Sequence, residues 1–340
     1  MKIKVLEGQH RKAWNQAVAD LPEATFFHLV EWQEVIAGSY GFTPYYLYAE
    51  DCTGICGILP LYHVRIPLLG SSLMSSPLGV YGGAIATSTD IQTQLEDVAV
   101  EQAKELSVGH LELRNVKRQR EGWAVNEAYS SFQRELYADE EANLLAIPRK
   151  QRAEVRKGIK AELSTRVHRD VDGFFQLYAR SVRDLGSPIY PKRYFQLLLD
   201  IFSKNCGIHT VYKADQPLTT VMNFYFKDTV LPYYGGGVAD ARNYSAFPFM
   251  YWELMRMSAQ QGYRNFDFGR SLKGSGAFSF KKNFGFKAYP LNYQYQLISA
   301  KHISGADPDN SAHKMFSRLW RHLPLSVANR LGPLVSRMIV

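Results

Sequence analysis

The second half of the chain repeats the first, and this duplication constrains the fold more than any other feature. Four elements occur twice in the same order: a strand that runs into a turn before a second strand, a diglycine, a helix, and a short strand that ends in arginine. In that order, the pairs are residues 46–51 and 210–215, 80–86 and 233–239, 91–106 and 245–261, and 111–114 and 266–270. This repetition predicts two copies of one α/β unit, each a mixed sheet with flanking helices.

The duplication also predicts the domain organisation. We expect a first domain at residues 1–140, a linker helix at 141–163, a second domain at 164–300 and a tail at 301–340. With 340 residues and 46% hydrophobic side chains, the chain is large enough for two cores. The expected fold class is therefore α/β, with mixed sheets in two tandem domains.

The linker is predicted to be a strongly basic helix over Asn143–Leu163. Arg149, Arg152, Arg156 and Lys160 are spaced by three, four and four residues, which places them on one helical face. Such a face is most often simply solvated. The same pattern fits a ridge that binds phosphate groups, and at this point both interpretations stay open.

The tail from Ser311 to Val340 contains five Lys or Arg residues and no acidic residue. An apolar stripe at helical spacing lies opposite the basic positions. The stripe consists of Met315, Phe316, Leu319, Trp320 and Leu323. Such a helix can lie on an anionic bilayer surface, which predicts peripheral membrane contact through residues 311–340. Packing of the stripe against the protein itself explains the pattern equally well.

Composition narrows the choice of partner and compartment. The net charge of +8 favours an anionic partner, such as a nucleic acid, a phosphorylated substrate or a membrane surface. Cys52, Cys56 and Cys206 provide neither a disulfide framework nor a zinc site, which favours a reducing compartment. The first residues lack the apolar core of a signal peptide, and residues 66–89, the longest uncharged run, contain too much Gly, Pro and Ser for a spanning helix. We expect a cytoplasmic protein, either free or held peripherally on the inner membrane.

Residues 263–297 are the stretch in which we expect the chemistry. The pattern predicts a strand at 265–268, a glycine-bearing loop at 269–276, a short helix at 278–283 and a strand at 289–297. The charged residues in this aromatic stretch include Asp267, Arg270, Lys273, Lys281 and Lys282. A strand that leads through a Gly-rich loop into a helix N-terminus is a natural site for an anion or a substrate. An ordinary sheet edge can show the same pattern.

Motifs of several enzyme classes are missing from the sequence. The nine histidines form no HExxH or HxxxH pair, so we do not expect a metal hydrolase. There is no G-x-S-x-G elbow and no P-loop. Gly274 and Gly276 supply only half of a dinucleotide-binding fingerprint. We therefore predict no metal and no permanently bound cofactor.

A more specific signal comes from FDFG at residues 266–269 and from FKKNFG at residues 280–285. Together they resemble the strand and the FKxxFG signature of the FemAB (Fem-ligase) family. That family has two tandem GNAT-type acyltransferase domains, which agrees with the duplication. The resemblance covers nearly the whole chain, including the helix of Trp32, residues 59–61, both YGG segments and the basic linker. Residues 185–190 and the glycine-rich segment are most similar to the FemAB-like branch associated with exosortase/PEP-CTERM and exopolysaccharide loci.

The resemblance implies transfer of an acyl group to an amine during cell-envelope or exopolysaccharide assembly. Such a reaction needs a neutral amine, an activated ester or thioester, and stabilisation of an oxyanion. The implied donor is aminoacyl-tRNA or acyl-CoA, and the implied acceptor is an envelope or exopolysaccharide precursor. Lys281 matches the FK lysine of the family, which implies charge stabilisation at the transferring carbonyl, with the Phe280 backbone beside it. A surface lysine on a short helix is the plainer alternative.

The other candidate residues have less specific roles. Asp267 could orient the amine or accept its proton, although fixing the loop at the strand end is the simpler role. Arg270 could bind a phosphate or a carboxylate through its guanidinium group. Tyr233 and Tyr234 could line an acceptor channel or belong to the core, and no residue stands out as a general base. The candidates for substrate binding on the linker helix are Arg152 and Arg156.

One departure from the family pattern concerns the acceptor. Classical members commonly carry a lysine shortly after the tryptophan of the early helix, where it helps to bind a nucleotide-linked precursor. Here Trp32 is followed by Gln33, Glu34, Val35 and Ile36, which puts a UDP-linked peptidoglycan substrate in doubt. Two alternatives from other classes are a non-catalytic protein that binds a polysaccharide precursor and an RNA-binding protein. The missing RNP and KH signatures weigh against the second alternative.

Overall fold

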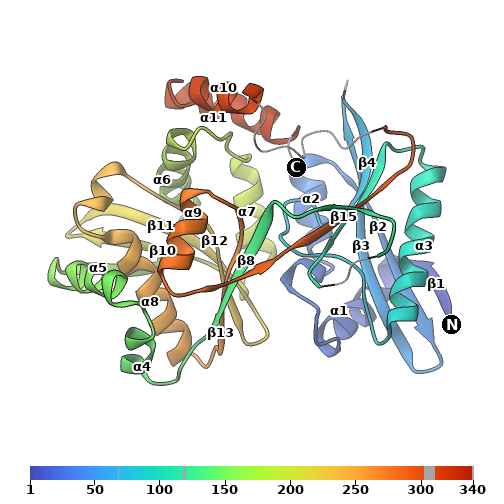
Figure 1. Cartoon of the computed structure of the whole chain (residues 1–340), viewed down its shortest axis with the longest axis horizontal. Coiled ribbons are helices and arrows are strands. Elements are labelled where there is room, and N and C mark those ends of the chain that lie inside the picture. Colours follow the sequence, from blue (N-terminus) through green and yellow to red (C-terminus); the bar gives the residue numbers. More distant parts are fainter. Residues whose placement is uncertain (68, 118–119, 302–310, 339–340) are drawn as a thin grey trace. The chain divides into compact units, whose positions relative to one another are not determined.

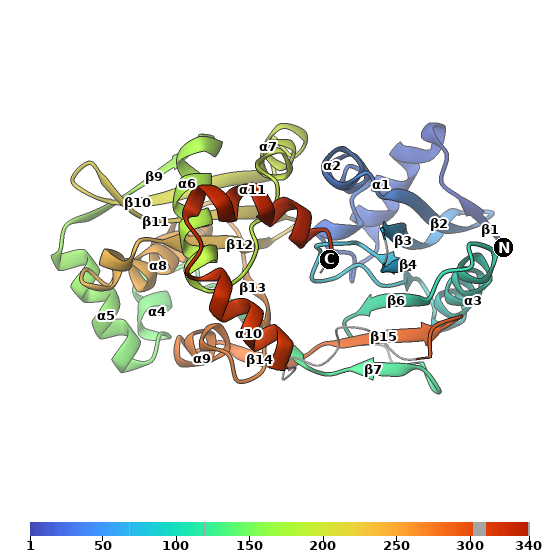
Figure 2. The same ribbon diagram turned by 90° about the horizontal axis from the view of Figure 1, so that it is seen from above.

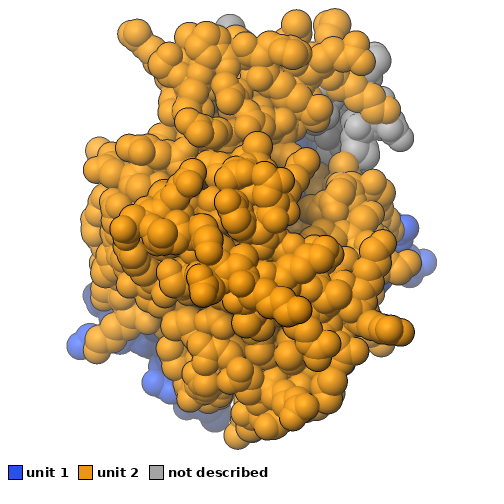
Figure 3. Space-filling view, turned by 90° about the vertical axis from the view of Figure 1, so that its left-hand side faces the viewer, with its two compact units in different colours: residues 1–128, 290–308, 337–340 blue, residues 129–289, 309–336 orange. Residues whose placement is uncertain are grey.

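The computed structural model describes residues 1–67, 69–117, 120–301 and 311–338, with the backbone alone at 311–313. The chain forms two compact units (Figures 1 and 3). Unit 1 comprises Met1–Ala128, Pro290–Pro308 and Arg337–Val340, and unit 2 comprises Tyr129–Tyr289 and Asp309–Ser336. The chain thus passes from unit 1 into unit 2 and back twice.

Unit 1 is built on a mixed sheet whose described strands have the order β1-β2-β3-β4-β6-β15-β7, with β5 paired to β3. The strands are β1 (Lys2–Val5), β2 (Thr43–Asp51), β3 (Gly54–Ile66), β4 (Gly70–Ser75), β5 (Ile85–Ala86), β6 (His110–Asn115), β7 (Ala124–Asn126) and β15 (Asn292–Leu297). The helices are η1 (Gly8–His10), α1 (Arg11–Asp20), η2 (Phe26–His28), α2 (Trp32–Tyr40) and α3 (Thr89–Glu105). Strands β4 and β6 are parallel.

Alternation along β2 builds the core of unit 1 on both faces of the sheet. Leu47 and Ala49 belong to the apolar cluster that includes α3. Tyr46 points the other way and packs on Trp14 of α1, with ring centroids 4.9 Å apart. Successive side chains of a strand point to opposite faces, so β2 contributes to a core on each side.

Unit 2 repeats this plan with a sheet whose described strands have the order β14-β8-β13-β12-β11-β10-β9. The strands are β8 (Tyr129–Glu135), β9 (Leu163–His168), β10 (Cys206–Lys213), β11 (Gln216–Phe226), β12 (Thr229–Gly237), β13 (Asn265–Leu272) and β14 (Lys287–Pro290). The helices are α4 (Glu140–Leu145), α5 (Arg149–Lys160), α6 (Val171–Asp184), α7 (Lys192–Ile201), η3 (Ala239–Arg242), α8 (Ala246–Gln260), α9 (Gly276–Asn283), α10 (Ser311–Trp320) and α11 (Leu325–Ser336). Helices α6 and α7 lie on one side of the sheet and α8 on the other (Figure 1).

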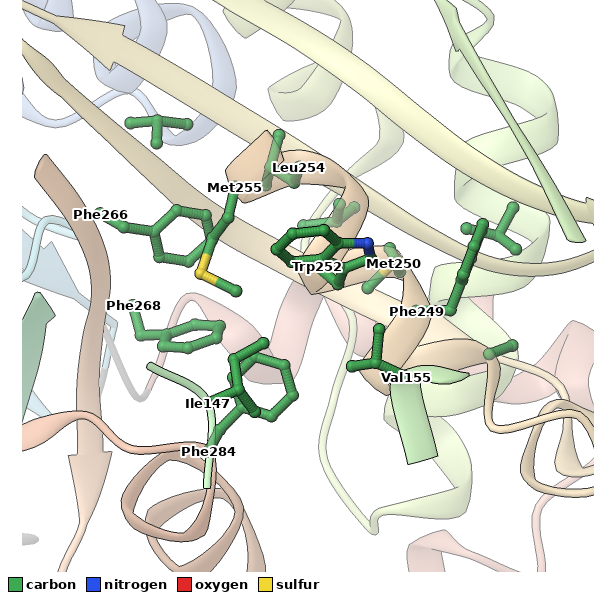
Figure 4. Close-up of a cluster of buried hydrophobic side chains, with 14 of the residues drawn as sticks. Ile147, Val155, Phe249, Met250, Trp252, Leu254, Met255, Phe266, Phe268 and Phe284 are labelled. Carbon is green, nitrogen blue, oxygen red and sulfur yellow. The ribbon is translucent and has the colours of Figure 1, made fainter. Parts of the chain in front are cut away.

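One core of unit 2 lies between α8 and the sheet (Figure 4). Trp252 and Met255 of α8 belong to one buried cluster with Phe266 and Phe268 of β13. Phe284, directly after α9, belongs to the same cluster. These aromatic contacts fix β13 and α9 against α8, and both elements contribute to the candidate site.

The predicted duplication is confirmed by the order of elements. Strands β2, β3 and β4, helix α3 and strand β6 of unit 1 correspond to β10, β11, β12, α8 and β13 of unit 2. In each unit, the last two strands of this series are parallel neighbours. The α/β fold class with two mixed sheets is therefore also confirmed.

The two diglycines, in contrast, lie in different local structures. Gly235 and Gly236 belong to β12 and pair with β11. Gly82 and Gly83 lie in an irregular segment between β4 and β5, both of which pair with β3. Gly235 and Gly236 thus lie within the strand equivalent to β4, whereas Gly82 and Gly83 follow β4, so the sequence match between the glycines is not a structural match.

The units differ from the predicted domains because the two halves exchange a strand. Strand β8 falls in the predicted first domain, but it pairs with β13 and belongs to unit 2. Strand β15 falls in the predicted second domain, but it pairs with β6 and belongs to unit 1.

The predicted linker helix is two helices within unit 2. Helix α4 ends at Leu145, and Pro148 is the N-cap of α5. Proline lacks the N–H that a continuous helix would require, so the helix is interrupted there. Leu163, the predicted last helical residue, is already the first residue of β9.

The predicted apolar stripe of the tail is divided by the fold. Trp320 is buried, Phe316 stacks on it with ring centroids 5.1 Å apart, and Leu323 is half-buried. Met315 and Leu319 are exposed. One part of the stripe therefore packs against the protein, and the other part faces solvent. Residues 302–310 and 339–340 of the predicted tail lie outside the described residues.

Within the described ranges, no helix has both the length and the apolar character needed to cross a bilayer.

Candidate active site

The parallel strands β12 and β13 separate soon after they meet. They pair at Thr229 with Asn265 and at Val230 with Phe266. Beyond these pairs, β12 continues beside β11, and β13 continues beside β8. Diverging strands leave main-chain N–H and C=O groups without ladder partners along their facing edges, so a ligand can bind between them.

Asp267 lies at the point of divergence and is only 4% exposed. Its Oδ1 accepts a hydrogen bond from the main-chain N–H of Gly269 (2.7 Å), and its Oδ2 accepts one from Nε2 of Gln133 (3.0 Å). The pairing of β13 with β8 is irregular between Asp267 and Arg270, and Gly269 has a φ of +62°, a conformation that favours glycine. Asp267 therefore holds a β-bulge in place, which is the simpler of the roles considered for it.

Lys281 reaches this bulge from α9. Its Nζ donates to the main-chain oxygens of Phe268 (2.7 Å), Arg270 (3.1 Å) and Gly269 (3.4 Å). Burial lowers the pKa of Lys281 to about 8, and the carboxylate of Asp267 opposes this decrease. The amine is thus mostly protonated at pH 7, yet it titrates close to that pH.

Helix α9 is fixed at both ends, which directs Lys281 toward β13. At its start, the hydroxyl of Ser275 accepts the N–H of Phe278 (3.1 Å) as an N-cap. Phe280 is an anchor in the core, since its ring lies 5.4 Å from that of Phe284 and contacts α8 through Tyr251. The adjacent Lys282 is exposed. Neighbouring residues of a helix point in different directions, so Lys281 points toward β13 and Lys282 points into solvent.

The structure places Arg270 close to Lys281 and assigns the two candidate tyrosines different environments. The Arg270 guanidinium lies over the ring of Tyr129, with 4.8 Å between Cζ and the centroid. Tyr234 is buried, its hydroxyl hydrogen-bonds to that of Tyr194 (2.8 Å), and burial raises its pKa. Tyr234 is therefore a core residue. Tyr233 is half-buried and remains the candidate for contact with a substrate.

Arg152 and Arg156 lie on α5, which packs on α8. Arg156 is exposed, and Arg152 is half-buried, with Nη1 donating to the oxygen of Leu145 (3.4 Å). The structure therefore brings Lys281, Asp267 and Arg270 together and places the two arginines of α5 on a separate surface element.

Two residues at the bulge were not predicted from the sequence. Gln133 and Tyr129 both lie on β8, and Gln133 is 134 positions away from Asp267 in the chain. Only the pairing of β8 with β13 brings them to the site, and no local pattern indicates that pairing.

The equivalent opening in unit 1 is closed by its own chain. Arg114 of β6 is 3% exposed, and its guanidinium donates to the carboxylate of Glu112 (2.8 Å). It also donates to the main-chain oxygens of Gly79 (2.6 Å) and Ser76 (3.3 Å), in the irregular segment after β4. A buried ion pair and a loop thus fill the gap where β4 and β6 separate.

A separate pocket of about 330 Å³ in unit 2 is lined by residues that include His168 and His209. None of the predicted site residues lines it. Among the residues that the structure describes, no group of three or more His, Cys, Asp or Glu side chains is arranged to hold a metal ion.

A comparison with family models adds an independent assignment for unit 2. Residues 149–282 match the acetyltransferase (GNAT) domain. The match lies entirely within unit 2. The matched segment runs from the first residue of α5 to the residue after Lys281, so it contains the diverging strands and the bulge.

Comparisons with solved structures extend the similarity to both units. FemX has a TM-score of 0.70 at 14% identity, over 88% of this chain and 98% of FemX. L-PGS from Bacillus licheniformis has a TM-score of 0.57 at 9% identity, over 94% of this chain and 99% of L-PGS. A tandem GNAT protein from the clavulanic acid biosynthesis pathway has a TM-score of 0.55 at 11% identity, over 91% and 99% of the two chains. These similarities show a fold of tandem GNAT-like domains. A separate comparison with curated protein sequences found no match.

Proposed function

We propose that the protein is an N-acyltransferase that acts at the bulge of unit 2. The observation that carries this proposal is the difference between the two openings. The bulge of unit 2, beside its opening, lies within the GNAT match and binds Lys281, an amine with a pKa of about 8. The opening of unit 1 is filled by Arg114 and Glu112.

In the proposed reaction, a neutral amine of the acceptor attacks the carbonyl carbon of an ester or thioester donor. A C–N bond forms, the C–O or C–S bond breaks, and the amine proton leaves with the alkoxide or thiolate. After the C–N bond has formed and before the C–O or C–S bond breaks, negative charge develops on the carbonyl oxygen. The longest hydrogen bond of Lys281, at 3.4 Å to Gly269, is the one that this oxygen would replace, while Phe268 and Arg270 keep the ammonium in position.

The other side chains have supporting roles in this proposal. Asp267 keeps the bulge rigid through Gly269 and Gln133. Arg270 binds a phosphate or carboxylate of a substrate, and Tyr233 contacts the acceptor. The backbone of Phe280 lies beside Lys281 on α9. Each of these groups is tied to the rigid sheet or helix, which is what positioning a reactive carbonyl requires.

The donor in this proposal is aminoacyl-tRNA or acyl-CoA, both of which are polyanions that suit the net charge of +8. The basic face of α5 would bind the phosphates of a tRNA. The resemblance to the FemAB family and the similarity to FemX support an amine on a cell-envelope precursor as the acceptor. The resemblance to the exosortase/PEP-CTERM branch supports an exopolysaccharide precursor in particular, with the reaction in the cytoplasm.

The decisive experiment measures transfer from labelled aminoacyl-tRNA or labelled acyl-CoA to amines of an envelope extract, with products identified by mass. Lys281→Ala should lower turnover by about 10²–10³-fold, because it removes a group that stabilises the oxyanion. Lys282→Ala is the matched control, since Lys282 is adjacent and exposed, and it should retain turnover. Equal turnover of wild type and a folded Lys281→Ala variant would remove Lys281 from the site.

A second experiment separates the two donors. The paired reversals Arg152→Glu and Arg156→Glu should weaken tRNA binding and reduce its dependence on salt, because fewer phosphate contacts release fewer counterions. Transfer from acyl-CoA should be unaffected. Lys2→Glu with Lys12→Glu makes the same charge change on exposed residues of unit 1 and serves as the control. An unchanged salt dependence in the α5 variant would show that this face is only solvated.

A further inference from the structure

The C-terminal helices α10 and α11 expose an apolar stripe in addition to the face with which they pack. The exposed residues are Met315 and Leu319 on α10, and Val327, Leu331 and Leu334 on α11. Their spacings of four, and of four and three, place one stripe on each helix. The most exposed of them, Leu334, leaves 67% of its surface in solvent.

The opposite face of each helix is already occupied by contacts within unit 2. Trp320 of α10 and Ala328 of α11 are buried. Gly332 lies so close to Ile189 that an added Cβ would be 2.6 Å from its Cγ2. Figure 2 shows α11 beside α6, and Arg183 of α6 donates to the oxygen of Leu323 (3.0 Å) in the turn between the tail helices. The exposed stripes are therefore not the means by which the helices are held.

Basic side chains border both stripes. Arg318 follows Met315 by three residues, and Arg330 follows Val327 by three, so each arginine lies beside the stripe of its own helix. Both arginines are exposed. Residues 311–340 contain no acidic residue. Each helix thus combines an inner packing face, an outer apolar stripe and a cationic border.

The combination of these features identifies the class of partner. An anionic bilayer takes up apolar side chains between its acyl chains and binds arginine at its headgroups. A nucleic acid would use the charges but would leave Leu319 and Leu334 in water. A second copy of the same surface would bring cations against cations across a two-fold interface.

We propose that α10 and α11 dock the protein peripherally on an anionic phospholipid surface, with the two apolar stripes entering the interfacial region. The docking does not rest on acyl transfer, since none of its residues belongs to the site at Lys281. Where both hold, docking brings that site to an acceptor carried on a lipid.

The test is co-sedimentation of the full-length protein with vesicles of phosphatidylcholine alone and with vesicles that also contain phosphatidylglycerol. The wild type should bind the anionic vesicles more tightly, and added salt should weaken this binding. Leu319→Ser with Leu334→Ser should lower the partition coefficient at least about tenfold, because two large apolar side chains no longer leave water. The matched control is Leu145→Ser with Val167→Ser, which replaces two residues of unit 2 with similar exposure outside the tail.

The contribution of charge is tested by Arg318→Glu with Arg330→Glu. Each basic residue near an anionic surface contributes about a factor of five, so these reversals should reduce binding by about 10²-fold or more. The residues replaced in the apolar, charge and control variants are exposed, and circular dichroism and the melting temperature verify folding. Lys281→Ala should bind vesicles as the wild type does, which separates this inference from the proposed function.

Two results would overturn the inference. One is equal vesicle binding by the wild type, the apolar variant and the charge variant. The other is a concentration-dependent dimer in the absence of lipid that the apolar variant loses, because that result would assign the stripes to a second copy of the chain.

Discussion

Units 1 and 2 each place an acidic residue where the parallel strands cease to pair, but the two acids have different partners. Glu112 is the last residue of β6 that pairs with β4, and Asp267 follows directly after the last residue of β13 that pairs with β12. Glu112 binds Arg114, two residues further along the same strand (2.8 Å). Asp267 binds main-chain and amide N–H groups, and the nearby cation, Lys281, comes from the separate helix α9.

The element that carries the cation determines whether the gap between the diverging strands is filled. Arg114 belongs to the diverging strand itself, so its guanidinium fills the gap and binds the loop after β4. Arginine also stays protonated in proteins, so this ion pair is a permanent part of the core. Lys281 binds the bulge from outside the strand pair, and its pKa of about 8 lets its charge change. One copy of the repeat thus has a buried, permanently charged arginine at this position, while the other has a lysine with a pKa of about 8.

The largest expected effect is on the stability of unit 1. Arg114→Ala leaves Glu112 as a buried charge without its ion-pair partner, which should lower the free energy of unfolding by about 3–5 kcal/mol. Urea denaturation measures this loss. The double variant Glu112→Gln with Arg114→Met removes both charges and should recover most of the stability. A loss below about 1 kcal/mol for Arg114→Ala would contradict the description of unit 1 as closed by this pair.

The next effect is a pH dependence specific to unit 2. The pKa of Lys281 is lowered from 10.5 to about 8, so between these values the unfolded chain holds a proton that the folded protein has lost. Stability therefore rises with pH across this window, by up to about 3 kcal/mol, because each pKa unit corresponds to 1.36 kcal/mol. The measurement is the difference in unfolding free energy between wild type and Lys281→Met from pH 7 to pH 10.

The control for this measurement is Lys282→Met, which makes the same substitution at the adjacent, exposed position. A constant difference between wild type and Lys281→Met over the whole range would mean that burial does not perturb Lys281. The contrast with the permanently charged Arg114 would then be lost.

The sequence predicts the repeat because each copy keeps its local patterns, such as the strand and turn before Asp51 and before Asp215. It also predicts that Lys281 lies in an aromatic frame, since Phe280 and Phe284 flank it at helical spacing. The exchange of β8 and β15 was not predicted, because strand pairing across more than 100 residues leaves no local pattern. For the same reason, Gln133 and Tyr129 could not be assigned to the site.

A smaller effect is expected at the diglycines, which match in sequence but have different neighbours in the two units. An added Cβ on Gly83 would collide with Asn115, whose Cα would be 2.9 Å away. The nearest atom to a Cβ on Gly235 would be the hydroxyl of Tyr251, at the far end of a side chain (2.9 Å). Gly83→Ala should therefore destabilise by about 1–3 kcal/mol, and Gly235→Ala by less than about 1 kcal/mol. Thermal unfolding of both variants measures the two losses of stability. Equal losses would indicate that the two glycines have equivalent environments.

The smallest expected difference concerns the outer strand pairs of the two sheets. In unit 1, Lys4 of β1 binds Glu50 of β2 (2.6 Å). In unit 2, Arg166 of β9 binds Asp215 (3.0 Å) and also covers the ring of Tyr212, with 4.3 Å between Cζ and the centroid. Ion pairs in water contribute little and are screened by salt, so Lys4→Ala should leave the melting temperature unchanged.

Arg166→Ala should lower the free energy of unfolding by about 0.5–1 kcal/mol, because it also removes the contact between the guanidinium and the aromatic ring. Most of this loss should persist in 1 M salt, where the Debye length is about 3 Å and the ion pair with Asp215 is screened. Asp215→Asn is the matched control, since it removes the ion pair and keeps the ring contact. The contrary result is that Asp215→Asn is as destabilising as Arg166→Ala at low salt and that both losses of stability vanish at high salt. In that case the two sheet edges are held by the same kind of weak ion pair and differ only in sequence.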